Sequence, residues 1–151
     1  MNKIHQISAE HLSIEQIGEI IKNGTKLELS EDARQRIIRC REYLDNKIKE
    51  SETPIYGVTT GFGSLCKISI DKDSLSQLQK NLVMSHACGV GDRVPNEIVK
   101  IMLLLKIQSL SYGYSACQLK TVERLIDFFN NDIYPIVYMQ GSLGASGDLV
   151  P

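Results

Sequence analysis

The sequence predicts a mainly α-helical domain. Apolar residues recur at three- and four-residue steps in five separate segments, which is the spacing that places them on one face of a helix. Two glycine-rich stretches, Tyr56–Leu65 and Gly141–Pro151, lack this period and are predicted to be loops. Because loops carry binding and catalytic residues more often than helices do, we expect function at these two stretches.

Two helices are predicted before the first glycine-rich stretch. The first follows Ser13, which forms a capping-box pattern with Gln16, and it ends at Asn23-Gly24. The second begins at Ser30 and ends before Thr53-Pro54, with arginine and glutamate opposite its apolar face. The apolar positions of these two helices are Ile14, Ile17, Ile21, Ala33, Ile37, Cys40, Leu44 and Ile48.

Three further helices are predicted, from about Asp73 to Gly89, from about Asn96 to Gly113, and around a stripe that ends at Asn130-Asn131. The middle one is apolar nearly all round, which predicts a central position. The segment "IYPIVYMQ" is expected to be extended and to lead into the second glycine-rich stretch. The faces of the outer two helices consist of Leu75, Leu78, Leu82, His86, Leu119, Val122, Ile126 and Phe129.

Composition and charge exclude several classes of function. Seventeen basic and eighteen acidic residues give a net charge of −1, so no nucleic-acid surface is expected. The longest aliphatic run, Ile101–Leu105, is too short to span a membrane, and the N-terminal segment lacks the apolar core of a secretory signal, so we expect a cytoplasmic protein without a membrane partner. The four cysteines are more than twenty positions apart and the three histidines are not beside them, so no metal site is expected.

The stretch "GSLGASGDLVP" departs from two common loop motifs. A phosphate-binding loop requires a lysine after its glycines, and none follows here. A serine-hydrolase elbow requires GxSxG, whereas Gly144–Gly147 has its second glycine one place too early. Two interpretations stay open: a flexible turn before a helix capped by Ser146 or Asp148, and a backbone that itself reacts.

The residue types of Ala145-Ser146-Gly147 suit the second interpretation. If the Gly147 nitrogen is pressed against the Ala145 carbonyl carbon, the backbone can close a five-membered ring, and loss of two waters leaves an exocyclic methylidene. Glycine permits the close approach because it has no Cβ, and serine supplies the hydroxyl that is eliminated. The product is a strong electrophile that needs no added cofactor.

Three motifs in this order resemble the aromatic amino acid lyase family. "GSLGASGDLVP" resembles its prosthetic-group motif, "YGVTTGFGSL" its catalytic tyrosine loop, and "NLVMSHACGVGD" its substrate-selectivity helix. The resemblance extends over nearly the whole chain. It implies the N-terminal part of the helical, fumarase/aspartase-like lyase fold, and a 4-methylideneimidazol-5-one (MIO) group formed from Ala145, Ser146 and Gly147, with no metal or external cofactor.

The resemblance also implies roles for residues in the first two motifs. Tyr56 is the expected base that removes the β-hydrogen of the substrate, although a half-buried tyrosine bonded to backbone is the alternative. A free tyrosine has a pKa of about 10, so ionisation near neutrality requires ~4 kcal/mol of anion stabilisation. Ser85 and His86 are expected to face the substrate, with a satisfied core histidine as the alternative, and Gly61 is expected to let the tyrosine loop approach it closely.

The Ser85-His86 pair is typical of the histidine-directed members of the family. The resemblance therefore implies elimination of ammonia from L-histidine to give trans-urocanate, in which the substrate amine bonds to the methylidene carbon. Attack by the imidazole ring instead of the amine stays open. A tyrosine-directed ammonia-lyase or 2,3-aminomutase, and a catalytically inert helical fragment, are the alternatives.

Family members are several times longer than this chain. Residues 1–151 are therefore expected to be the N-terminal portion of a single catalytic domain that continues beyond Pro151. We expect the isolated 151 residues to be inactive, because the family completes its pocket with later residues. The resemblance implies a homotetramer for the full-length enzyme.

Overall fold

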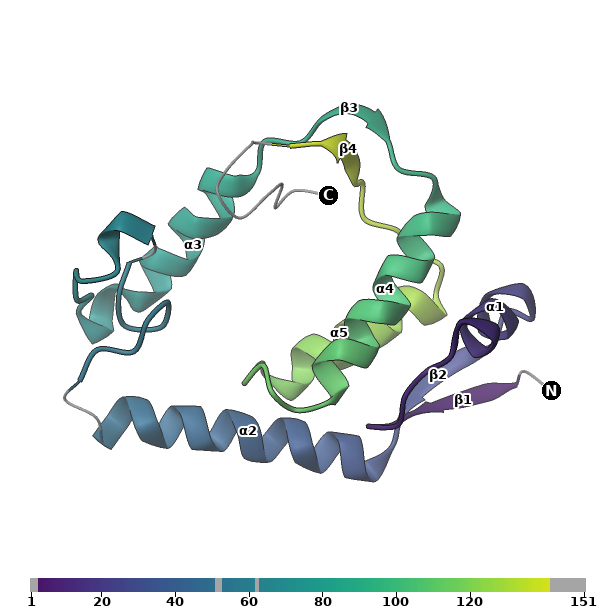
Figure 1. The fold of residues 1–151 in the computed structure, drawn as a ribbon, viewed down its shortest axis with the longest axis horizontal. Helices are drawn as coiled ribbons and strands as arrows, with labels where there is room; N and C mark the ends of the chain where they lie inside the picture. The colour runs from purple at the N-terminus through teal and green to yellow at the C-terminus, as the bar shows by residue number, and fades with distance from the viewer. Residues whose placement is uncertain (1–2, 51–52, 62, 142–151) are drawn as a thin grey trace. The chain divides into compact units, whose positions relative to one another are not determined.

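The structure, a computed structural model, describes residues 3–50, 53–61 and 63–141. The chain divides into two compact units, which we call unit 1 (residues 1–44 and 94–136) and unit 2 (residues 45–93 and 137–151). The described part contains five α-helices, which confirms the mainly helical prediction (Figure 1). Its elements are β1 (Ile4–Ile7), α1 (Ile14–Lys22), β2 (Lys26–Leu29), α2 (Glu31–Glu50), α3 (Leu75–His86), β3 (Val90–Arg93), α4 (Asn96–Ser111), α5 (Leu119–Asn130) and β4 (Tyr138–Gln140), with 3₁₀ turns at Gly63–Leu65 and Lys72–Ser74.

The first two helices begin where their capping residues predict. The Ser13 hydroxyl accepts a hydrogen bond from the Gln16 N–H at 3.2 Å, and the Gln16 side chain accepts one from the Ser13 N–H at 2.8 Å. This reciprocal pair satisfies two backbone donors that the first turn of α1 leaves without helical partners. At the start of α2, the Ser30 hydroxyl accepts a hydrogen bond from the Ala33 N–H at 3.2 Å.

A pair of parallel strands in unit 1 was not predicted from the sequence. β1 and β2 lie side by side, joined by α1, with Ile4 opposite Lys26 and Ile7 opposite Leu29 (Figure 1). Parallel strands require a crossover connection, which α1 supplies. In the sequence, β2 is indicated only by the alternation of Leu27 and Leu29 with polar residues, and both leucines are buried in the structure. A pattern of four residues is too short to predict a strand.

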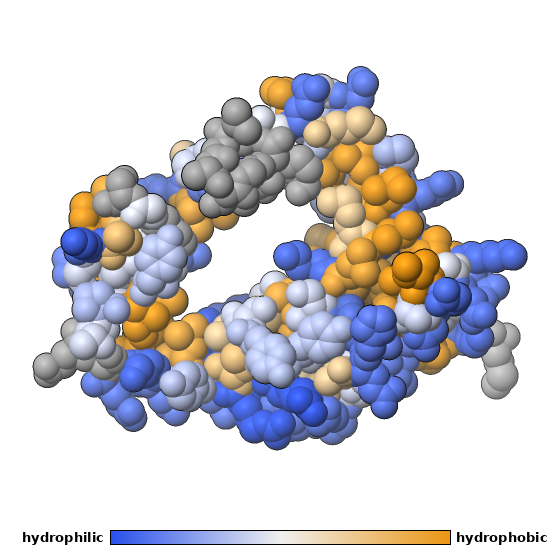
Figure 2. Space-filling model, viewed as in Figure 1, coloured by the Kyte–Doolittle hydropathy of each residue, from blue (hydrophilic) through white to orange (hydrophobic). Residues whose placement is uncertain are grey.

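The hydrophobic core of unit 1 forms around α4. Leu104 and Ile107 are fully buried, which confirms the predicted central position of this helix. The other face of α4 stays exposed in this chain, and Figure 2 shows hydrophobic residues in orange over α4 and hydrophilic residues in blue along α2. The core cluster consists of Ile7, Ile20, Leu27, Leu29, Ala33, Ile37, Leu103, Leu104, Ile107, Val122, Ile126 and Phe129.

Two amide side chains connect the elements of unit 1. The Gln108 side chain on α4 donates hydrogen bonds to the carbonyls of Ser8 and Glu10, at 2.8 and 3.1 Å, in the connection after β1. The Asn130 side chain at the end of α5 accepts from the Leu27 N–H at 2.7 Å and donates to the Leu27 carbonyl at 2.8 Å. Asn130 thus supplies β2 with the two hydrogen bonds that a neighbouring strand would provide.

Unit 2 contains α3 and a short antiparallel ladder. The face of α3 predicted to be apolar is confirmed, because Leu75, Leu78, Leu82 and His86 are its half-buried residues and all its others are exposed. The predicted extended segment contains β4, which pairs with β3. Val90–Arg93, which lie between two of the predicted helices and for which no strand was predicted, pair with a strand almost fifty positions later.

Candidate active site

The described parts of all three motif segments belong to unit 2, although they are far apart in the sequence. The tyrosine loop and the selectivity helix lie within residues 45–93, and the segment that leads to the Ala-Ser-Gly triad belongs to unit 2 from Val137 onward. Ala145, Ser146 and Gly147 themselves lie outside the described residues. The described part of the candidate site therefore consists of the first two motifs and the strand that precedes the third.

Two threonine hydroxyls hold the turn that bears Tyr56. The Thr59 hydroxyl accepts from the Ile55 N–H at 2.8 Å, and the Thr60 hydroxyl accepts from the Gly57 N–H at 3.1 Å. Thr60 is buried and also donates to the Gly61 carbonyl at 2.9 Å. These local threonine hydrogen bonds favour a compact turn over an extended segment at these residues.

Antiparallel backbone contacts close the loop behind this turn. Thr60 pairs with Ser69, and the Gly61 N–H donates to the Ile68 carbonyl at 3.1 Å. A Cβ on Gly61 would lie 2.6 Å from the Leu65 Cβ and 2.9 Å from the Leu65 carbonyl oxygen. Gly61 is thus required by the close approach of the 3₁₀ turn, which is a packing reason separate from the substrate contact that we predict for it.

The Tyr56 side chain is accessible. It is 63% exposed and not half-buried, although its hydroxyl does contact backbone, as the alternative interpretation supposes. The Gly63 N–H donates a long hydrogen bond of 3.4 Å to the Tyr56 hydroxyl oxygen.

Ser85 and His86 occupy the C-terminal turn of α3. The helix ends after His86 because Ala87 (φ −80°, ψ 63°) turns the chain, and the Cys88 N–H donates to the His86 carbonyl at 2.9 Å. These dihedral angles and this bond define an inverse γ-turn. The His86 ring is half-buried, with its Nδ1 2.8 Å from the Leu82 carbonyl oxygen and 3.0 Å from the Ser85 hydroxyl.

The β3–β4 ladder joins the selectivity helix to the segment that precedes the triad. Val90 pairs with Gln140, and Arg93 pairs with Tyr138 (Figure 1). β3 begins four residues after His86, and β4 ends five residues before Ala145. Sequence reasoning missed this pairing, because Val90–Arg93 shows no alternation of apolar and polar residues, and only the extended "IYPIVYMQ" segment indicated that a partner strand was needed.

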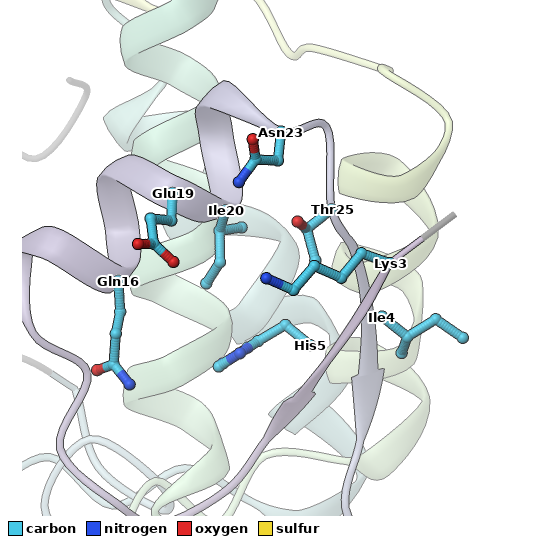
Figure 3. A pocket seen from close by; sticks show the side chains of 8 residues that line it. All are labelled: Lys3, Ile4, His5, Gln16, Glu19, Ile20, Asn23 and Thr25. Atoms are coloured by element: carbon cyan, nitrogen blue, oxygen red, sulfur yellow. The ribbon is translucent and has the colours of Figure 1, made fainter. Parts of the chain in front are cut away.

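The pockets found in unit 1 are lined by none of the predicted site residues. A pocket of about 140 Å³ lies in unit 1, and Figure 3 shows the side chains of Lys3, His5 and Glu19 directed into it. Burial lowers the pKa of His5, and the pocket contains none of the predicted site residues. The described residues contain no group of three metal-binding side chains, and none of the helices in this part of the chain could cross a membrane.

Comparison with known proteins places this geometry in a family. The model of the family described as aromatic amino acid lyase matches residues 12–151. A histidine ammonia-lyase from Deinococcus radiodurans is 49% identical over 140 residues, which is 93% of this chain and 26% of the relative. One from Caldanaerobacter subterraneus is 43% identical over 145 residues, which is 96% of this chain and 28% of the relative. The chain thus spans little more than a quarter of the length of these curated relatives.

Solved structures give the same result for the fold. The ergothionase of Treponema denticola superposes with a TM-score of 0.86 at 27% identity, over 93% of this chain and 28% of that one. A tyrosine aminomutase from Streptomyces globisporus superposes with a TM-score of 0.83 at 29% identity, over 95% of this chain and 27% of that one. The sequence motifs, the helical fold and the family match agree, and the chain belongs to the aromatic amino acid lyase family.

Proposed function

We propose that the complete protein that carries this chain eliminates ammonia from L-histidine to give trans-urocanate. The observation that carries this proposal is the 49% identity to a histidine ammonia-lyase over 93% of the chain, and the family match over residues 12–151 includes all three motifs. The Ser85-His86 pair supports the choice of histidine, because a half-buried imidazole at the end of α3 can hydrogen-bond a polar aromatic ring.

The proposed electrophile is an MIO group made from Ala145, Ser146 and Gly147. The chemistry of these residues fits the group, because serine supplies the hydroxyl to be lost and Gly147 adds no Cβ at the ring closure. When formed, the group supplies an electrophilic methylidene carbon that turns the substrate amine into a better leaving group. No metal is required for this chemistry.

The described residues supply the proton transfer and the orientation. Tyr56 is proposed as the base that removes the β-hydrogen, and the exposure of its side chain supports this role. His86 is proposed to hold the substrate side chain, with Ser85 beside it. Gly61 keeps the tyrosine loop compact and is proposed to leave space for the substrate next to Tyr56.

The organisation of the complete enzyme is part of the same proposal. Residues 1–151 form the N-terminal portion of one catalytic domain, in a cytoplasmic homotetramer whose substrate is a small amino acid. Two compact units in the chain are compatible with a single domain, because each unit is built from both halves of the sequence.

A second candidate function has an observation in its favour. The likeness to a tyrosine aminomutase, with a TM-score of 0.83, supports a tyrosine-directed ammonia-lyase or 2,3-aminomutase. The phenol of tyrosine, like imidazole, is an aromatic ring with a polar hydrogen. A catalytically inert helical protein is the alternative outside this class.

Two measurements on the complete protein test the proposal. Its intact mass should be two waters below that of the plain sequence, with a near-ultraviolet absorption band, and Ser146→Ala should abolish both signals. The wild type should turn over L-histidine faster than L-tyrosine. Faster turnover of L-tyrosine would establish the second candidate, and an unmodified mass without turnover would establish the inert alternative.

A further inference from the structure

Three hydrogen-bonding groups meet at the C-terminal turn of α3. The Nδ1 atom of His86 lies 2.8 Å from the Leu82 carbonyl oxygen and 3.0 Å from the Ser85 hydroxyl oxygen. The Ser85 hydroxyl is itself 2.9 Å from the same Leu82 carbonyl, to which it donates. These distances constrain where the imidazole carries its proton.

A carbonyl oxygen can only accept hydrogen bonds. If Nδ1 were unprotonated, its lone pair would face the lone pairs of Leu82 at 2.8 Å, which is repulsive. The Ser85 hydroxyl has one proton, and because that proton is directed to Leu82, the oxygen presents an acceptor to Nδ1. Both neighbours of Nδ1 are therefore acceptors, and each of them favours a proton on Nδ1.

The other ring nitrogen, Nε2, is then left without a proton. A neutral imidazole carries one proton, so a proton on Nδ1 leaves Nε2 as an acceptor only. Among the residues that the structure describes, no hydrogen-bond partner is found for Nε2, and the ring is half-buried at the end of its helix. Nε2 is the ring atom at which a ligand can bind.

The geometry points to Ser85 as a positioning residue that, with the Leu82 carbonyl, fixes His86 as the Nδ1–H tautomer, so that Nε2 accepts a hydrogen bond from the substrate side chain. This inference rests on the proposed function, in which His86 faces the substrate. The substrate must then be an aromatic amino acid whose side-chain ring carries an N–H or O–H donor.

Substrates whose ring carries a hydrogen-bond donor should react faster than analogues whose ring carries none. Neutral imidazole has a ring N–H, whereas the rings of 3-(2-pyridyl)-L-alanine and 3-(2-thienyl)-L-alanine have no donor. An unprotonated pyridine nitrogen would place its lone pair against that of Nε2. Because a lost or unpaired hydrogen bond of this kind costs roughly 1–3 kcal/mol, we expect kcat/KM to fall by about 10- to 100-fold for both analogues, and further for pyridylalanine than for thienylalanine.

The tautomer can be observed directly in the complete protein. Histidine labelled with ¹⁵N in the ring gives separate resonances for protonated and unprotonated nitrogens, and subtraction of the His86→Gln spectrum assigns those of His86. We expect a protonated Nδ1 and an unprotonated Nε2. A wild-type enzyme that turns over L-histidine with its His86 proton on Nε2 would overturn the inference and leave the proposed function standing.

Substitution of Ser85 tests its positioning role. Ser85→Ala removes the acceptor beside Nδ1 and should increase the Nε2–H population and lower kcat/KM for L-histidine several-fold, mainly through KM, with an unchanged melting temperature. Ser85→Thr keeps a hydroxyl and should restore both the tautomer and KM. If Ser85→Ala leaves the tautomer and KM unchanged, or if pyridylalanine is preferred to histidine, Ser85 does not have this role. An Nδ1–H tautomer in a protein that does not turn over L-histidine would instead contradict the proposed function.

Discussion

Units 1 and 2 differ in where their hydrophobic side chains lie. Every fully buried hydrophobic residue found in the described chain belongs to unit 1. In the described part of unit 2, the buried residues are Thr60 and Gly61, and large side chains such as Val83 and Met84 are 65–70% exposed. Unit 1 therefore supplies the packing free energy of this chain, whereas unit 2 contains the residues that we assign to chemistry.

The difference follows from the kind of interaction that orders each unit. Unit 1 is held by nonlocal apolar contacts among α4, α5, α2 and the β1–β2 pair. Unit 2 is held by the nonlocal β3–β4 ladder and by local hydrogen bonds, such as those of Thr59 and Thr60 around the tyrosine turn. A site built on loops and helix ends leaves its functional groups accessible, and it contributes little to the stability of the unit. Substitutions in the two units should therefore separate activity from stability.

The largest effect is expected for Tyr56→Phe in unit 2. This change removes only the hydroxyl proposed as the base, so turnover of L-histidine by the complete enzyme should fall by about 10²- to 10⁴-fold. The melting temperature should not change, because the side chain is 63% exposed. Tyr43→Phe is the matched control, since Tyr43 is a 70% exposed tyrosine in unit 1. Equal activity of the two variants would remove Tyr56 from the mechanism.

Leu104→Ala should have the largest effect on stability. Leu104 is fully buried in the core of unit 1, so its truncation leaves a cavity and should lower the free energy of unfolding by about 2–5 kcal/mol. Leu105→Ala, on the same helix but at a 46% exposed position, should cost much less. Denaturant unfolding of both variants measures the difference. Similar losses would show that the described core is not what stabilises unit 1.

Asn130→Ala tests the polar connection between α5 and β2. It leaves the Leu27 N–H and carbonyl without their side-chain partner, which should cost about 1–3 kcal/mol of unfolding free energy. Asn131→Ala is the control, because the exposed Asn131 side chain bonds only to the Asp127 carbonyl one turn earlier. If the two variants are equally stable, the Asn130 bonds to β2 contribute nothing measurable.

Local signals in the sequence were sufficient to predict the helices. The Ser13–Gln16 capping box and the spacing of the leucines on α3 determine structure within a few residues, and both predictions were confirmed. The strands could not be predicted in this way, because β1–β2 and β3–β4 depend on partners that the chain supplies much later. Asn130 shows the same limit: nothing near it in the sequence indicates that its amide binds the backbone of Leu27.

Some features of the candidate site could be predicted from the sequence, and others could not. The motifs predicted which residues to consider, and the predicted place of His86 on the leucine face of its helix was confirmed. The exposure of Tyr56, the packing reason for Gly61 and the Nδ1 contacts of His86 required coordinates, because each depends on how a turn closes. The roles of Tyr56, Ser85, His86, Gly61 and the Ala-Ser-Gly triad stay predictions.

The smallest effect is expected for Asp132→Asn, an ion-pair change on the surface of unit 1. The Lys100 ammonium donates to Asp132 at 2.6 Å, and this bond, followed by that from the Tyr134 hydroxyl, lowers the pKa of Asp132 below its ordinary 3.8. Burial is the largest single effect on Lys100 and opposes its charge, but the hydrogen bonds and charges of Asp132 and Tyr134 together outweigh burial and raise the Lys100 pKa above its ordinary 10.5.

The sign of the pH dependence follows from the lowered pKa of the carboxyl group. Its contribution to stability is present above pH 3.8 and is lost as the pH falls through the lower pKa of the folded state. Because Asp132 is 56% exposed, we expect Asp132→Asn to cost only about 0.5–1 kcal/mol at pH 7. Asparagine tolerates the positive φ of 54° at this position, so the change isolates the charge.

Unfolding at a series of pH values should show the wild type and Asp132→Asn converging below pH 3.8, and high salt should narrow the gap at pH 7. Tyr134→Phe is the companion variant, because it removes the other hydrogen bond to the same carboxylate and leaves its charge intact. A gap between wild type and Asp132→Asn that persists into strong acid would mean that residue 132 acts through its turn conformation and not through the ion pair. The stability of unit 1 would then depend still more completely on its apolar core.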